Sequence, residues 1–197
     1  MQVLDARKKI LGVEHPDTIR AKRDLAATYQ KLGKYTEAEK LQMQVMDARD
    51  RILGVEHPDT INAKEKLAAT YQDMRKYTEA EKLQMQVLDA RNRIDGVEHP
   101  DTIRAKGDLA TMYWKLGKYT DAEKLEVEVL DERNRIDGVE HPSTITAKLN
   151  LAATYQDMTR YTEAQKLQMQ VVDARDRILG AEHQETINAK EELATTY

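Results

Sequence analysis

The stretch LAATYQKLGKYTEAEKLQMQV at residues 25–45 decides the fold of this chain. It returns with few changes at 67–87, 109–129 and 151–171, so each copy begins 42 residues after the one before it. A period of this size is typical of stacked repeats, in which each unit contacts only its neighbours. We therefore expect a repeat protein and not a globular domain with one central core.

The period also places the boundaries of the units. We expect a single repeat array over 1–197 with these units: 1–10 (partial, the end of a second helix), 11–52, 53–94, 95–136, 137–178 and 179–197 (partial, a first helix). Because the sequence starts and stops inside a repeat, the pattern indicates a segment of a longer array.

Each full unit carries the signals of two helices, here called helix A and helix B. Helix A is predicted to begin at HPDT, 15–18, because proline in the first turn loses no hydrogen bond and polar oxygens lie near unpaired N–H groups. Gly33 supplies the left-handed residue that ends it. Helix B is predicted to begin at Thr36, which is spaced from Glu39 as in a capping box, and to end at Gly54. The same box recurs as Thr78 with Glu81 and as Thr120 with Glu123.

Apolar residues recur at helical spacing along both helices. The expected core positions of helix A are Ile19, Leu25, Ala26, Tyr29 and Leu32. Those of helix B are Ala38, Leu41, Val45, Ala48 and Ile52. Short loops make the two helices antiparallel neighbours, and neither can bury its apolar stripe alone. Stability must therefore come from stacking on the next unit.

These residues resemble a tetratricopeptide repeat. The positions that carry the resemblance follow the family's order of small and large packing residues: Leu25, Ala26, Tyr29, Gly33, Tyr35 and Ala38. The resemblance covers the whole chain and implies an all-α fold, a right-handed superhelical solenoid of antiparallel helix pairs. Departures from the shorter standard repeat are Lys22 and Gln42 in place of aromatic residues and Val45 in place of alanine.

The length of the unit indicates which tetratricopeptide repeat proteins this chain resembles most. The 42-residue period, the HPDT start and the sequence ARDRILG at 48–54 are similar to repeats of kinesin light chains and of the C-terminal arrays of fungal NOD-like receptors. The sequence LQMQVMDARDRILGVEHPDT at 41–60 is more similar to the receptor arrays. The receptor resemblance implies a nucleotide-binding switch domain N-terminal to the array, whereas this chain contains no phosphate loop of the form GxxxxGK[ST].

Composition excludes several kinds of site. The chain has no cysteine, which rules out disulfides, thiolate metal sites and cysteine nucleophiles. Its 31 basic and 35 acidic residues are interleaved, whereas a nucleic-acid surface needs one consistently positive face. No apolar run reaches the roughly 18 residues of a membrane span, and the N-terminal sequence lacks the apolar core of a signal peptide. We expect a cytoplasmic protein that binds neither nucleic acid nor membrane.

The five histidines follow the period: His15, His57, His99, His141 and His183. Equivalent atoms of successive helix pairs lie on the order of 10 Å or more apart, whereas zinc holds nitrogen ligands at about 2.1 Å, so these histidines do not share a metal. They are predicted to hydrogen-bond at the start of helix A. The alternative is a pH-sensitive edge, because histidine titrates near neutrality.

The chain offers no convergent set of acid, base and nucleophile. Nearly identical repeats would spread a catalytic group over several copies instead of collecting different groups in one pocket. We therefore expect no enzyme activity, no cofactor and no metal.

The units differ from one another mostly on one face of helix A. Positions 20, 23, 27, 30 and 31 are spaced to share that face, and the packing stripe hardly changes. In tetratricopeptide arrays the resemblance implies that this face lines a concave groove that binds extended or helical peptides. Helix B varies little, except that Glu126, Val127 and Glu128 replace Gln, Met and Gln in the third full unit. Such uneven variation favours recognition over drift of an exposed surface.

The candidate partner-binding residues on this face are Arg20, Arg23, Gln30, Lys31, Asn62, Glu65, Gln72, Asp73, Arg104, Gly107, Thr111, Trp114, Lys115, Thr146, Leu149, Gln156 and Asp157. Their charges alternate in sign from unit to unit, so a polyanion would be repelled at every second unit. A protein segment of mixed charge fits better.

Trp114 is the only tryptophan, and Gly107 lies two helical turns before it. Glycine inside a helix costs roughly 1 kcal/mol relative to alanine, which suggests that the space is needed. Gly107, Thr111 and Trp114 are therefore a candidate pocket with Trp114 as an aromatic anchor. The alternative is a surface tryptophan partly covered by Met112.

These observations favour a non-catalytic protein- or peptide-binding array. The resemblance implies the ligand-sensing region of a larger NOD-like receptor in innate immunity. One alternative is a cargo adaptor similar to kinesin light chains, and another is a structural scaffold that self-associates head to tail through its truncated ends.

Overall fold

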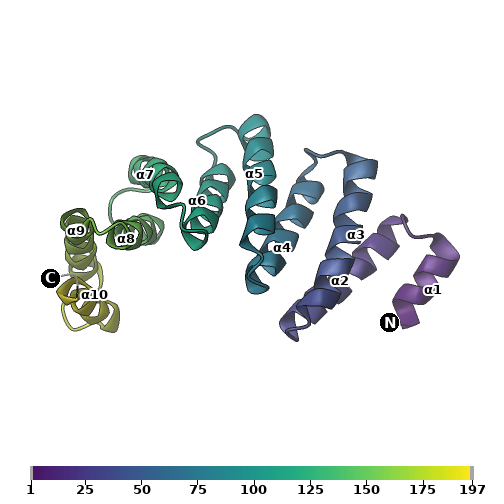
Figure 1. Cartoon of the computed structure of the whole chain (residues 1–197), viewed down its shortest axis with the longest axis horizontal. Helices are drawn as coiled ribbons and strands as arrows, with labels where there is room; N and C mark the ends of the chain where they lie inside the picture. The colour runs from purple at the N-terminus through teal and green to yellow at the C-terminus, as the bar shows by residue number, and fades with distance from the viewer. Residues whose placement is uncertain (1, 196–197) are drawn as a thin grey trace. The chain divides into compact units, whose positions relative to one another are not determined.

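The computed structural model describes residues 2–195, and within that range it contains ten helices and no strand (Figure 1). The helices are α1 (Gln2–Leu11), α2 (Pro16–Lys31), α3 (Tyr35–Leu53), α4 (Pro58–Asp73), α5 (Tyr77–Ile94), α6 (Pro100–Lys115), α7 (Tyr119–Ile136), α8 (Pro142–Asp157), α9 (Tyr161–Leu179) and α10 (Gln184–Ala194). The even-numbered helices are the A helices, and α3, α5, α7 and α9 are the B helices. The predicted all-α class is confirmed.

The chain forms two compact units, one up to Gly96 and one from Val97 onward. The first contains α1 to α5, and the second contains α6 to α10. Within each unit every helix packs against the next one along the chain. Three-residue connections such as 32–34 reverse the direction of the chain between the helices of a pair. This is the stack of helix pairs that the repeat predicts.

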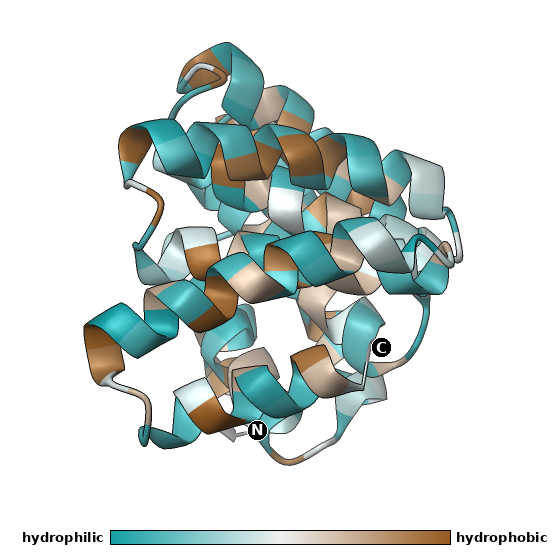
Figure 2. Ribbon diagram, turned by 90° about the vertical axis from the view of Figure 1, so that its left-hand side faces the viewer, coloured by the Kyte–Doolittle hydropathy of each residue, from teal (hydrophilic) through white to brown (hydrophobic). Residues whose placement is uncertain are grey.

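Hydrophobic and hydrophilic residues alternate along the helices that face the viewer in Figure 2. In the first full repeat the buried members of the predicted stripes are Ile19, Ala26, Ala38, Val45 and Ala48. The three alanines among them allow close approach of neighbouring helices.

Of the other predicted core residues, Leu25, Tyr29 and Leu41 are half-buried and two are exposed. Leu32 is 64% exposed and Ile52 is 50% exposed, so placing them in the core was wrong. Both lie at or next to the carboxyl end of a helix, where the chain turns away from its neighbours.

Polar side chains occupy core positions that the apolar pattern did not predict. Thr18 is fully buried, and Lys22 is only 5% exposed. The Lys22 ammonium donates to the backbone carbonyl of Val13 at 3.4 Å, and burial lowers the pKa of this lysine. In the third full repeat the equivalent lysine, Lys106, donates to Glu132 at 2.7 Å.

The predicted capping boxes at the start of the B helices are wrong. The N-cap residues of α3, α5, α7 and α9 are Lys34, Lys76, Lys118 and Arg160, and none of them receives a side-chain capping hydrogen bond. The turn after helix A is closed by backbone bonds, such as Lys34 N–H to Tyr29 C=O at 2.9 Å, so α3 begins before Thr36.

Two glutamates of the predicted boxes, Glu39 and Glu123, bond to residues of the next repeat. The Lys76 ammonium donates to Glu39 at 2.9 Å, and the Arg160 guanidinium donates to Glu123 at 2.6 Å. Each of these bonds joins one B helix to the N-cap residue of the next B helix. They therefore link successive repeats and do not cap a single helix.

The residue that ends helix A has a positive φ in every full repeat. Gly33 and Gly117 take φ of 70° and 72°, as predicted for a left-handed stop, but Arg75 and Thr159 occupy the same position with φ of 57° and 60°. Residues with a Cβ atom are disfavoured there, and a β-branched threonine most of all.

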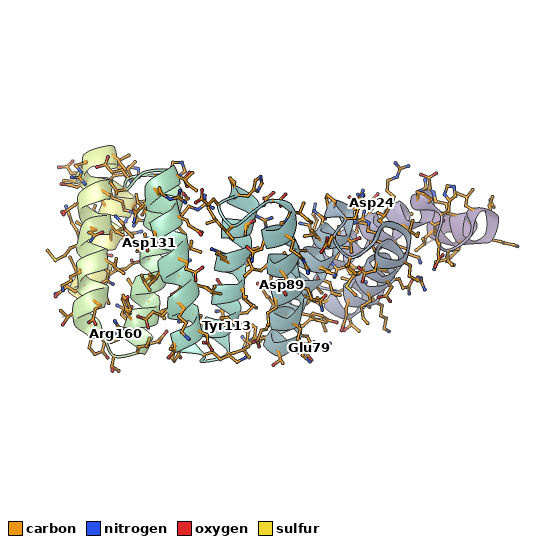
Figure 3. The ribbon with its side chains drawn as sticks, turned by 90° about the horizontal axis from the view of Figure 1, so that it is seen from above. Asp24, Glu79, Asp89, Tyr113, Asp131 and Arg160 are labelled. Carbon is orange, nitrogen blue, oxygen red and sulfur yellow. The ribbon has the colours of Figure 1, made fainter. Side chains whose placement is uncertain are left out.

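The exposed positions of the B helices carry both charged and apolar side chains, among them Met43 and Met85. Asp89 on α5 and Asp131 on α7 hold equivalent positions of the repeat and are exposed (Figure 3). None of the helices in the described range combines the length and apolarity needed to cross a bilayer.

Candidate functional site

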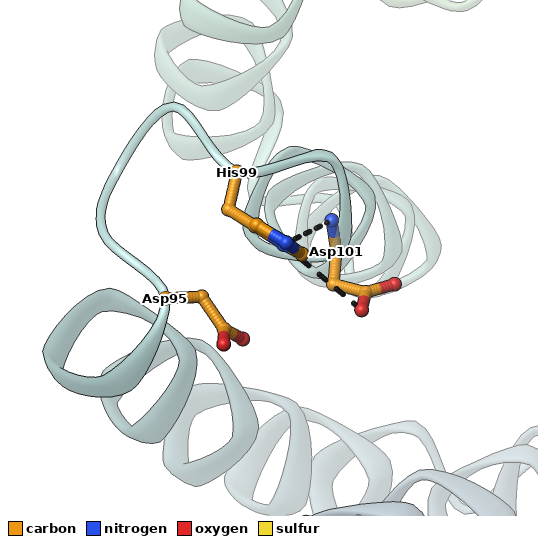
Figure 4. Close-up of side chains that lie close together, drawn as sticks. All are labelled: Asp95, His99 and Asp101. Atoms are coloured by element: carbon orange, nitrogen blue, oxygen red, sulfur yellow. Dashed lines mark hydrogen bonds and ion pairs between the residues drawn. The ribbon is translucent and has the colours of Figure 1, made fainter.

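The histidines cap the A helices, which confirms their predicted structural role. His99 Nδ1 accepts a hydrogen bond from the backbone N–H of Asp101 at 3.2 Å (Figure 4). The other four accept from the residue two positions later at 3.1–3.3 Å. A neutral ring that accepts at Nδ1 carries its proton on Nε2, and a metal ion at Nδ1 would break the cap. Protonation would also remove this acceptor, so the pH-sensitive edge stays a prediction.

One cluster near these caps contains a serine hydroxyl that the sequence analysis did not single out. Ser143 Oγ lies 2.7 Å from His141 Nδ1 and donates to Asp137 at 2.7 Å. The hydroxyl is therefore bonded to the carboxylate, whereas a hydrolytic triad needs the histidine between the two. This bond is also the main cause of the lowered pKa of Asp137. The cluster reinforces the start of α8.

Three pockets lie at the same position of the repeat. Pocket I lies between α2, α3 and α4, with a volume of about 310 Å³. Pocket II lies between α6, α7 and α8, with about 190 Å³. Pocket III lies between α8, α9 and α10, with about 330 Å³. In each, two consecutive A helices form the walls and the B helix between them forms the floor.

The three linings share four positions of the repeat, those of Ala27, Gln30, Gln42 and Lys66. Ala27, Thr111 and Ala153 occupy one equivalent wall position. The floor position is Gln42 in pocket I, Glu126 in pocket II and Gln168 in pocket III. Each pocket therefore keeps the same architecture while the chemistry of its lining changes.

Eight of the seventeen candidate residues line these pockets. They are Arg23, Gln30 and Asn62 in pocket I, Thr111, Trp114 and Lys115 in pocket II, and Leu149 and Gln156 in pocket III. Within each pocket, residues predicted from their spacing to share one face of helix A thus lie close together.

The remaining nine candidates lie outside the three linings: Arg20, Lys31, Glu65, Gln72, Asp73, Arg104, Gly107, Thr146 and Asp157. Several of them bond within the chain. Arg20 pairs with Asp17 at 2.7 Å, and Glu65 lies 3.6 Å from Arg91 of α5. Thr146 donates to the carbonyl of Pro142 at 2.9 Å. Their variation between repeats therefore changes contacts inside the protein as well as its surface.

Two hydrogen bonds join consecutive A helices across the groove. Gln30 donates to the carboxylate of Asp73 at 3.1 Å beside pocket I. Trp114 donates its indole N–H to Asp157 at the equivalent place beside pocket II. In both bonds the partners are 43 residues apart, one more than the repeat period.

Two of the three residues of the candidate pocket around Trp114 lie together in the structure. Thr111 and Trp114 line pocket II, whereas Gly107 is not in its lining and is linked to Thr111 by a bond from Oγ1 to its carbonyl at 3.0 Å. The indole is half-buried, and the Lys115 ammonium lies 4.5 Å from its ring centroid. Met112 is fully buried in the core.

Sequence reasoning missed the floor of the groove. Gln42, Glu126 and Gln168 are all buried, at 6–7% exposure, although they project from helix B. A signal was present, because the family usually has an aromatic residue at the position of Gln42, and because Glu126 breaks the constancy of helix B. Burial raises the pKa of the Glu126 carboxyl, the nearby Glu123 adds to this effect, and the Thr154 hydroxyl opposes it.

Known proteins support the repeat architecture. Family models described as tetratricopeptide repeat match residues 18–59, 59–135 and 143–197. A Podosopora anserina protein that is named for kinesin light chain and carries nearly identical TPR-like repeats is 31% identical, with a TM-score of 0.82 over 93% of this chain and 87% of that chain. The structure of BtubC (BKLC) from P. vanneervenii is 18% identical, with a TM-score of 0.76 over 98% of this chain and 78% of that chain, and it shares the fold. No curated protein sequence matches the chain significantly.

Proposed function

Because the chain belongs to the tetratricopeptide repeat family, we propose that it is a non-catalytic array that binds a protein or peptide segment along the groove of its A helices. The observation that carries this proposal is the recurrence of pockets I, II and III at one position of the repeat with different linings. A constant framework fixes the geometry of a bound chain, and a variable lining selects its side chains.

The linings favour a partner of mixed charge. Pocket I contains Arg23 and Lys66 beside Asp24, whereas pocket II contains Glu126 and Lys115. A polyanion gains little where a carboxylate forms the floor, so nucleic acid is disfavoured. A peptide with both signs of charge can meet opposite charges at each pocket.

The larger protein that carries the array is also part of the proposal. The similarity of residues 41–60 to receptor arrays supports the ligand-sensing region of a cytoplasmic NOD-like receptor. The 31% identity to a protein named for kinesin light chain supports a cargo adaptor as the second candidate. The full-length gene separates them, because a nucleotide-binding domain encoded upstream supports the receptor and its absence contradicts it.

Selection from a phage-displayed library of short linear peptides tests the binding function. Enriched peptides are synthesised and titrated against the parent protein, an Arg23→Glu variant of pocket I and an Asn150→Arg variant, which alters the wall shared by pockets II and III. We expect each peptide to lose about tenfold in affinity with at least one variant, as is usual when charge complementarity is lost.

The matched control is Lys40→Glu. Lys40 is exposed on α3 and lies outside the linings of pockets I to III, so its reversal changes net charge without touching the groove. A library that yields no enriched peptide, or peptides that bind every variant alike, would contradict the proposal.

A further inference from the structure

Pockets I and II differ in charge at three equivalent positions. Pocket I has Arg23 and Lys66 in its walls and Gln42 in its floor. The residues at the corresponding positions around pocket II are Gly107, Asn150 and Glu126. Two cationic side chains are thus absent and a carboxylate is added. An ideal Cβ at Gly107 would meet no atom within 4 Å, so the place of the Arg23 side chain is open space.

The carboxylate of Glu126 is buried without full compensation. Glu126 is 7% exposed, and its Oε2 atom has no hydrogen-bond partner among the side chains that the structure describes. Nor does any basic side chain of this part of the chain form an ion pair with it. A buried carboxylate is strongly disfavoured unless it is paired. The other full repeats have glutamine at this position, Gln42, Gln84 and Gln168, so the fold does not require a carboxylate there.

The walls of pocket II supply the rest of a cation site. Trp114 presents an indole whose N–H is already bonded to Asp157, which fixes the ring and brings a second carboxylate to the rim. An aromatic face attracts a cation, and more strongly where water is excluded. Ala153 and Thr111 add small walls that leave room for an aliphatic stem.

Lys115 is the one cation in this lining, and its ammonium lies over the indole and not on Glu126. Its side chain is exposed, so it neutralises the floor carboxylate only weakly. An incoming cation that reaches the floor therefore finds Glu126 without an ionic partner.

We propose that pocket II binds the cationic side chain of a lysine or arginine of the partner peptide, with Glu126 as the counter-ion and Trp114 as the aromatic wall. This inference rests on the proposed peptide-binding function and names the chemistry of one side chain of the ligand. The raised pKa of Glu126 is consistent with it, because burial without a cation disfavours the charged carboxylate.

The test uses Nα-acetyl-lysine N-methylamide and Nα-acetyl-arginine N-methylamide as probes of the two cation types. Because Trp114 is the only tryptophan, its indole N–H gives a single NMR signal that reports on pocket II. We expect saturable shifts of this signal at millimolar concentrations of at least one probe. The norleucine analogue, which has an uncharged side chain of similar length, is expected to give no saturable shift.

Two variants decide whether Glu126 is responsible. Glu126→Gln is expected to fold, because glutamine is the native residue of the other repeats, and to weaken binding at least about tenfold, as loss of a buried charge partner does. Asp131→Asn removes the same charge from an exposed position of α7 that is not in the lining of pocket II, and it is expected to bind like the parent. Removing the neighbouring cation with Lys115→Met is expected to tighten binding.

Equal shifts with the norleucine analogue, no saturable shift with either cationic probe, or unchanged affinity in Glu126→Gln would each overturn the cation site. These outcomes are distinguishable from failure of the proposed function, which the peptide library tests separately. If peptides bind the groove and Glu126→Gln leaves their affinity and sequence preference unchanged, peptide binding stands and the cation site does not.

Discussion

Arg49 of α3 donates from Nη1 to the backbone carbonyl of Asp59, in the first turn of α4, at 2.8 Å. The same bond recurs from Arg7 to Asp17 and from Arg175 to Glu185, each at 3.0 Å. Arg49 is only 9% exposed, so its bond is shielded from water. These arginines therefore tie α1, α3 and α9 to the start of the A helix that follows each of them.

Replacing Arg49 by alanine is expected to lower the free energy of unfolding by about 2–3 kcal/mol, because a buried hydrogen bond from a charged group and the packing of its stem are lost together. Urea unfolding followed by circular dichroism measures the change. The matched control is Arg51→Ala on the same helix. Arg51 pairs with Glu14 at 2.7 Å, but both side chains are more than half exposed, so we expect a loss below about 1 kcal/mol. Equal losses for the two variants would contradict this role of Arg49.

The histidine caps give a second prediction. Removing the side-chain acceptor with His57→Ala is expected to destabilise the protein by about 1 kcal/mol, because the N–H of Asp59 loses its partner at the start of α4. His57→Asn is expected to recover most of the loss, since asparagine is a good N-cap residue. Thermal unfolding measures both. An alanine variant as stable as the parent would show that this bond contributes nothing.

The positive φ of Thr159 predicts a stabilising substitution. A β-branched residue is strained in the left-handed region, where glycine is not, so Thr159→Gly is expected to raise stability by about 0.5–1 kcal/mol. The reciprocal control is Gly117→Thr, at the same position of another repeat, which is expected to lower stability. If both substitutions moved the unfolding midpoint in the same direction, backbone strain would not be the cause.

The burial of the Glu126 carboxyl predicts how the free energy of unfolding depends on pH. Burial raises the pKa of this carboxyl in the folded state above its value in the unfolded chain. Between these two pKa values the folded state binds more protons, so stability decreases as pH rises through the window. At neutral pH and above, the Glu126→Gln variant should therefore have a higher unfolding midpoint than the parent.

The difference between the two proteins should shrink as pH falls below the unfolded pKa of the carboxyl, where Glu126 is protonated in both states. Thermal unfolding from acidic to weakly alkaline pH measures it. Asp131→Asn, an exposed carboxylate on the same helix, is the control and should follow the parent. A constant difference between Glu126→Gln and the parent would mean that titration of Glu126 is not its origin.

The sequence predicted the elements of this fold well where the deciding interactions are local. The starts of the A helices at Pro16 and its equivalents, the histidine caps and the stop at Gly33 depend on residues within a few positions of one another. The predicted capping boxes were wrong, although Thr36 and Glu39 are also close in sequence. The same spacing is compatible with a capping box and with a Glu39 side chain that pairs elsewhere. The pairing of Glu39 with Lys76, 37 residues away, is visible only once repeats are stacked.

The candidate site was predictable in outline. Spacing alone placed Arg23, Gln30 and Asn62 on the A-helix face, and they line pocket I. It did not reveal that Glu65 pairs with Arg91, or that Gln42 and Glu126 form the groove floor. Floor residues project from helix B, and their direction relative to the walls depends on how three helices cross.

By itself the sequence determined the repeat, its period, the helix pairs and the caps, because these follow from propensity, periodicity and hydrogen bonds between near neighbours. The tertiary structure alone decided which polar residues are enclosed and which charges are already paired. Burial depends on atoms from other repeats, and the energy of a charge such as that of Glu126 is set by the water and counter-ions that packing removes.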